Sequence, residues 1–260
     1  EILFAERSQL GRAFGDKRDR GAILSYALGD PKAFGARLSL GAVNGMADSA
    51  AKGKVGDANA QKDLIARLDM NVGREHRFGL YTLQGGTDVS DKSGSAIAPA
   101  APSAGWPSQA AIYDAKDKTT NLGAFYEFQG ESWILNAECI TGLLGRRYPT
   151  LAASSPALKR EHLDQKFTGY YVTGGYRFGS HTLLARYDML NYNSGDDWYT
   201  PASPYVTGAA DFTPKFTEIT LGYTYAFNPE KVKAANIKVN YIARSKNFLK
   251  PNPATQTAEQ

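Results

Sequence analysis

An arginine and an aspartate stand two positions apart in the stretch "LLARYDML", where Arg186 and Asp188 flank Tyr187. Side chains two residues apart point to the same face of a β-strand. A guanidinium group offers a planar fork of donors that matches the oxygens of phosphate or carboxylate, and it stays charged at any working pH. Arg186 could therefore contact a dissolved anion, or it could form a structural ion pair with the neighbouring acid.

The same alternation assigns charged residues of both signs to one face of the other alternating segments. The basic residues predicted on this face are Arg37, Arg67, Arg77, Arg177, Arg186, Lys238 and Arg244. The acidic residues predicted there are Asp19, Asp63, Asp69, Glu127, Glu138, Asp188 and Glu218. Because a charge facing lipid near the bilayer centre is costly, this regular placement predicts residues that line a hydrated lumen. The best candidates for contact with solutes are Arg37, Arg67, Arg77, Arg186 and Arg244.

Catalytic chemistry has little support in the sequence. The three histidines, His76, His162 and His181, are predicted in a short turn, a long loop and another short turn, so they do not meet. A membrane-embedded hydrolase would depend on His162 beside Ser154 and Ser155. We therefore do not expect an enzyme.

Cofactor and metal sites are not expected either. Asp88 and Asp91 do not match the spacing of a calcium-binding loop. The stretch "GGTDVSDKSGS" lacks the strand, glycine spacing and helix of a phosphate-binding loop. The single cysteine, Cys139, cannot form an internal disulfide and is predicted on the apolar face as a small apolar residue.

The elements that would position these residues are about ten segments in which apolar residues alternate with polar ones. Their length suits tilted strands that cross a bilayer. The predicted strands cover residues 18–28, 34–44, 62–71, 76–84, 119–128, 132–142, 167–178, 181–191, 216–227 and 236–246.

The connections between these segments alternate between short and long. The turns "GDPK", "VGRE", "QGE" and "GS" are short, whereas residues 45–61, 85–118, 144–166 and 193–215 form long loops. This alternation is typical of an up-and-down barrel in an outer membrane, in which closure leaves no unpaired edge. We predict an all-β, antiparallel transmembrane β-barrel. The loop 85–118 could fold inward, with Asp88, Asp91, Asp114 and Asp117 facing the wall, or it could lie outside.

Composition agrees with this fold class and excludes others. The chain of 260 residues has 15 Tyr, 12 Phe and 26 Gly, a profile rich in strand-forming aromatics and turn residues. Its formal charge of +4 is scattered, so nucleic acid is not an expected partner. The longest uncharged stretch, 93–113, contains three prolines and does not suit a membrane-spanning helix.

Aromatic residues gather just before the short turns, as in the aromatic girdle of a membrane barrel. They are Tyr126, Phe128, Tyr176, Phe178, Tyr225 and Phe227. A soluble β-sandwich also has one apolar and one polar face, so it stays an alternative.

Several stretches in order carry a family likeness: "ERSQLGRAFGDKRDRGAILS", "RLSLGAVNG", "KDLIARLDMN", "NAECITG", "GYYVTGGYRF", "LLARYDML" and "ITLGYTYAFN". Together they resemble the phosphate-selective porin O and P family of Gram-negative bacterial outer membranes. The resemblance implies a barrel of about sixteen strands, often a homotrimer, that passes small anions such as phosphate.

The resemblance also implies that residues 1–260 are one porin domain lacking strands before Glu1 and a closing strand after Gln260. The expected partners are outer-membrane lipid and small anionic or polar solutes. Because the predicted inward charges cancel, general diffusion stays as plausible as anion selectivity. The alternative function is a structural outer-membrane barrel that anchors a larger assembly and conducts little.

Overall fold

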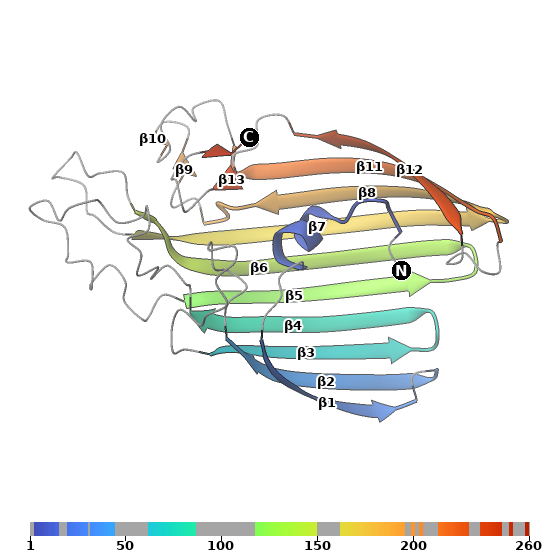
Figure 1. Cartoon of the computed structure of the whole chain (residues 1–260), viewed down its shortest axis with the longest axis horizontal. Coiled ribbons are helices and arrows are strands. Elements are labelled where there is room, and N and C mark those ends of the chain that lie inside the picture. Colours follow the sequence, from blue (N-terminus) through green and yellow to red (C-terminus); the bar gives the residue numbers. More distant parts are fainter. Residues whose placement is uncertain are drawn as a thin grey trace, which may run out of the picture.

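The structure is a computed structural model that describes residues 3–15, 20–30, 32–44, 62–86, 118–149, 162–195, 199–200, 203–204, 213–228, 235–245, 250–251 and 258–259. Ten strands form one antiparallel sheet in the order β1-β2-β3-β4-β5-β6-β7-β8-β11-β12 (Figure 1). Each strand pairs with the next strand of this order. Among the described residues, no helix has the length and apolarity needed to cross a membrane.

The ten strands match the ten predicted segments. Their bounds are β1 Gly21–Gly29, β2 Phe34–Val43, β3 Asp63–Val72, β4 His76–Gly86, β5 Lys118–Gln129, β6 Trp133–Pro149, β7 His162–Phe178, β8 His181–Asn191, β11 Lys215–Ala226 and β12 Asn236–Arg244. The all-β, antiparallel up-and-down fold is thus confirmed. β6 and β7 extend further than predicted, because they pair beyond an irregularity in their register between Leu144 and Tyr148.

Some small elements were not predicted from the sequence. They are a π-helical turn η1 (Gly11–Gly15) and the two-residue strands β9 (Tyr199–Thr200), β10 (Ser203–Pro204), β13 (Lys250–Pro251) and β14 (Ala258–Glu259). A two-residue pair is too short to show a periodicity of two, which explains why the alternating pattern does not reveal these strands.

The short connections lie together at one end of the sheet, called here the turn end (Figure 1). Gly29, Gly73 and Gly179 in three of these turns have positive φ angles of 74°, 64° and 54°. A residue with a Cβ rarely adopts this conformation, so glycine sets the tight reversal. These short turns also fix the register of the strands on either side.

The two faces of the sheet differ as predicted. The outward face carries exposed apolar side chains on every strand, such as Leu24, Leu122 and Val239, which are 78 %, 58 % and 60 % exposed. The opposite face, called here the polar face, carries the charged residues. β1 and β12 have no second strand partner among the described residues, so the sheet is open in this structure.

Residues 3–15, called here the N-terminal segment, lie across the polar face (Figure 1). Phe4 is 3 % exposed and packs in one cluster with Ile134 of β6 and Leu184 of β8. Further along the segment, the ring of Phe14 stacks on Phe167 of β7 with centroids 4.6 Å apart. The segment therefore covers part of the face that carries the charges.

Candidate functional site

The strand registers align the charged residues of the polar face in a row that crosses the sheet. From β2 to β12, residues directly opposite one another in this charged row are Arg37, Asp69, Gly79, Phe125, Glu138, Tyr171, Asp188, Glu218 and Arg244. The next row toward the turn end contains Asn71, Arg77, Glu127, Asn136, Thr173, Arg186 and Thr220. Charges predicted from separate segments thus lie in two adjacent rows, where uncharged residues such as Gly79, Phe125 and Tyr171 separate them.

A first ion-pair cluster spans β3, β4 and β5. Arg67 donates from Nε and Nη2 to both carboxylate oxygens of Asp69, at 2.8 and 2.9 Å. Arg77 bonds Asp69 at 2.9 Å and Glu127 at 3.3 Å. Both guanidinium groups also lie over the ring of Phe125, 4.9 and 5.2 Å from its centroid. The charges of Arg67 and Arg77 balance those of Asp69 and Glu127. About two fifths of each arginine side chain is exposed.

Two glycines make room for the aromatic side chains of this cluster. A Cβ placed on Gly79 would lie 2.0 Å from the ring of Phe125, and one placed on Gly123 would lie 2.1 Å from the ring of Tyr81. Each ring therefore lies flat across a neighbouring strand. Tyr81 donates its hydroxyl hydrogen to Glu138 at 2.7 Å, which holds that carboxylate on the polar face.

A second ion-pair cluster lies on β8, β11 and β12, and Arg186 is at its centre. Its Nε lies 2.6 Å from Asp188 and its Nη2 lies 3.1 Å from Glu218. Arg244 on β12 bonds Glu218 at 2.7 Å. Arg186 is only 4 % exposed, and Asp188 and Glu218 are 0 % and 1 % exposed. In this structure these three predicted lumen residues are therefore enclosed rather than open to solutes.

The N-terminal segment encloses this second cluster and adds charges of its own. The guanidinium of Arg186 lies over the ring of Phe4, 4.6 Å from its centroid, and donates to the backbone oxygens of Glu6 and Arg7. Arg12 bonds Glu218 at 2.9 Å and Glu6 at 2.9 Å. Sequence reasoning missed Glu6 and Arg12, because they lie outside any alternating segment.

Arg37 differs from the four arginines that form ion pairs on the polar face, Arg67, Arg77, Arg186 and Arg244. It is exposed, and among the described residues it has no ion-pair or hydrogen-bond partner. It lines a polar pocket of about 230 Å³ near the turn end, together with Asp69, Asn71 and Arg77. Two guanidinium groups, one amide and the carboxylate of Asp69 line this pocket, so its charged groups sum to +1, a balance that favours a small anion over a cation.

The other predicted residues on the polar face lie apart from these clusters. Arg177 faces Thr182 near the turn end, Lys238 faces Thr224, and Asp63 is buried opposite Val43 at the far end. Asp19 falls outside the described residues, as do Ser154, Ser155 and the loop aspartates Asp88, Asp91, Asp114 and Asp117. Whether the polar face lines a pore stays a prediction.

Two of the three histidines lie on the outward face at the turn end. Nδ1 of His76 lies 3.0 Å from the Tyr126 hydroxyl, and Nδ1 of His181 lies 2.7 Å from the Tyr223 hydroxyl. Each imidazole also packs among aromatic rings of the girdle. His162 was predicted in a long loop, but it is the first residue of β7, at the end of this strand away from the turn end.

Comparisons with known proteins find similarity among solved structures. No protein-family model matches the chain, and no curated protein matches it. Among solved structures the chain is similar to a porin refined at 1.8 Å, with a TM-score of 0.47 and 12 % sequence identity over 85 % of this chain. The chain spans 56 % of that porin's length.

Proposed function

We propose that the chain is part of an outer-membrane porin through which small polar or anionic solutes diffuse passively. The separation of the two faces across ten consecutive antiparallel strands supports this function most directly. Exposed leucines, valines and aromatics on the outward face suit hydrocarbon, whereas ion pairs on the opposite face suit water. A soluble sandwich would cover its apolar face with a second sheet, and the described residues form only the one large sheet.

The proposal includes closure of the barrel by strands beyond β1 and β12, a single barrel domain, and assembly as a homotrimer. Closure would satisfy the backbone groups at the two open edges, which lipid cannot do. The N-terminal segment would then lie inside the lumen and narrow it beside β7, β8 and β11. Solutes would pass the side that the segment leaves open, where Arg37, Arg67 and Arg77 are partly exposed.

Selectivity for phosphate-like anions is the finer part of the proposal, and it follows the resemblance to the phosphate-selective porin O and P family. The pocket with Arg37 and Arg77 supports it, because two guanidinium groups face the same small volume. The balanced charges of both clusters limit the expected preference, since paired charges give a weak net field.

Planar bilayer recording tests the function. A porin gives stable, ohmic single-channel steps, and in a salt gradient an anion-preferring pore gives a reversal potential of the corresponding sign. A folded protein that inserts but conducts nothing would favour the alternative, a structural barrel that anchors an assembly. The N-terminal segment supports this alternative, because it packs on the polar face and occupies part of it. Cation preference would exclude the anion claim while leaving the porin intact.

A further inference from the structure

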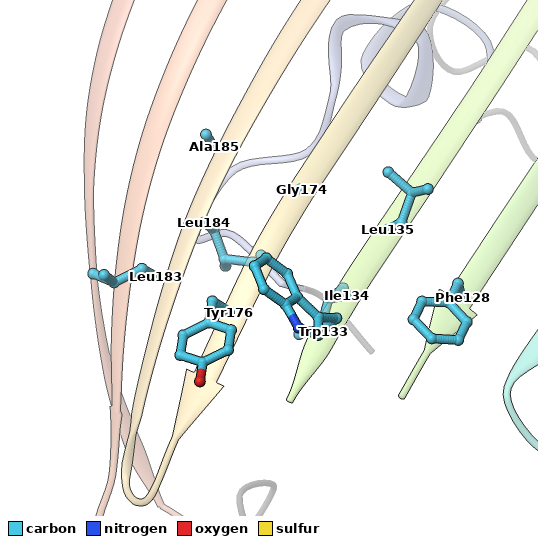
Figure 2. A pocket seen from close by; sticks show the side chains of 10 residues that line it. Phe128, Trp133, Ile134, Leu135, Gly174, Tyr176, Leu183, Leu184 and Ala185 are labelled. Atoms are coloured by element: carbon cyan, nitrogen blue, oxygen red, sulfur yellow. The ribbon is translucent and has the colours of Figure 1, made fainter. Parts of the chain in front are cut away.

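A groove of about 610 Å³ runs along the outward face near the turn end (Figure 2). Gly174 of β7 lies at its base, directly between Leu135 of β6 and Ala185 of β8. In Figure 2 Leu183 and Phe128 lie at the two sides of the lining residues, with Tyr176 and Trp133 between them. The depression exists because β7 has no side chain at residue 174 and β8 has only a methyl group at residue 185.

The groove is apolar along its length and has polar groups at one end. Every side chain that lines it is aliphatic or aromatic, and none is charged. The polar tips are those of Trp133 and Tyr176, whose rings pack with centroids 4.7 Å apart. In Figure 2 the hydroxyl of Tyr176 points toward the turn end, whereas Leu135 and Ala185 lie further along the strands. Indole and phenol groups of this kind sit where hydrocarbon meets the headgroups of a bilayer.

We propose that this groove is a binding site for one acyl chain of a membrane phospholipid, with the ester end of the lipid beside Trp133 and Tyr176. The uncharged lining fits hydrocarbon and offers no charged partner to a free anion. The inference rests on the proposed membrane location of the outward face. It goes beyond the porin function, because ordinary lipid contact needs no groove and occupies no fixed place.

Gly174 allows a direct test. A Cβ added at this residue has no atom within 4 Å, so the Gly174→Leu side chain starts in open space and extends into the groove. Ala42→Leu is a matched control, because Ala42 is also a small, exposed residue on the outward face but lies on β2. Both substitutions add apolar bulk to the same surface.

Trp133 reports on the groove. In a background in which every other tryptophan, Trp106 and Trp198 included, is replaced by Phe, Trp133 is the only indole that reports. The folded, full-length protein in detergent micelles is titrated with a phosphatidylcholine that carries bromine on its acyl chain, which quenches indole fluorescence on contact. The inference expects quenching that saturates at equimolar lipid, is lost in Gly174→Leu and is kept in Ala42→Leu. Gly174→Ala, which fills less of the groove, should weaken binding without removing it.

Three outcomes overturn the lipid site. Quenching that rises without saturation means nonspecific contact, and quenching that is unchanged in Gly174→Leu places the lipid elsewhere. A Gly174→Leu variant that changes the oligomeric state in cross-linking, with no saturable quenching in the parent, assigns the groove to a second copy of the chain. Conductance measured on the same preparations separates this inference from the porin proposal, because the channel can conduct whether or not the groove holds lipid.

Discussion

Glu218 and Asp188 lie directly opposite one another on β11 and β8, and neither carboxylate side chain has exposed surface. Like charges facing each other across a strand pair repel, and burial strengthens the repulsion. Arg186 resolves the conflict, because its guanidinium forms an ion pair with each carboxylate and lies over the ring of Phe4. The N-terminal segment and the sheet therefore share one charge network.

Replacing Arg186 with Met should destabilise the protein strongly. The substitution keeps most of the apolar volume but leaves two buried carboxylates facing each other without their shared partner. Breaking a buried ion pair in this way costs about 3–5 kcal/mol. Urea unfolding followed by tryptophan fluorescence measures the loss. Arg67→Met is the control, because Asp69 still pairs with Arg77 in that variant. If Arg67→Met lost as much free energy of unfolding as Arg186→Met, the special role of the enclosed cluster would be contradicted.

Replacing Arg37 with Gln should reduce anion preference with little effect on stability. Arg37 is exposed on the polar face and has no ion-pair partner among the described residues, so its charge is available to solutes. The reversal potential in a salt gradient should move toward cation preference. Lys215→Gln removes the same charge from the outward side of β11 and should leave the reversal potential unchanged. Equal shifts in both variants would show that Arg37 acts only through the net charge.

Replacing Gly79 with Ala should disturb the first ion-pair cluster. The added methyl group would occupy the place of the Phe125 ring, and the ring would have to leave Arg67 and Arg77. Overpacking of this kind costs about 1–3 kcal/mol. Gly174→Ala is the control, because a Cβ there meets no atom within 4 Å. If urea unfolding finds the two variants equally stable, the ring does not need the glycine beneath it.

The two histidine and tyrosine pairs at the turn end should stabilise the strand pairs that they join. His76 and Tyr126 link β4 to β5, and His181 and Tyr223 link β8 to β11 with the same arrangement. A double-mutant cycle of His76→Phe and Tyr126→Phe should give a coupling free energy of about 0.5–1.5 kcal/mol, as for an ordinary hydrogen bond. A coupling near zero in unfolding from lipid vesicles would mean that the two side chains contribute only by packing.

The sequence predicts the two faces well because alternation is a local property of each strand. Arg186 and Asp188 share a face from their spacing alone, and the short turns carry that parity from one strand to the next. Burial of the same two residues could not be predicted, because it depends on Phe4 and Glu6, about 180 positions away in the chain. The apolar residues of the N-terminal segment do not recur at a regular spacing, so its sequence does not indicate the surface on which it packs. The choice of ion-pair partners likewise depends on side-chain geometry across strands rather than on parity.

Loosening the N-terminal segment should widen the proposed pore. Phe4 is 3 % exposed and fills the space above Gly222, where a Cβ would lie 2.8 Å from its ring. Phe4→Ala would remove this apolar contact and the ring that lies against the Arg186 guanidinium, so the segment should bind the polar face less tightly. The expected result is a larger single-channel conductance together with faster trypsin cleavage after Arg7 or Arg12. Glu6→Gln is the control, because it removes only half-exposed ion pairs, which contribute little. Faster cleavage without any rise in conductance would show that the segment docks on the polar face but does not narrow the path of the solutes.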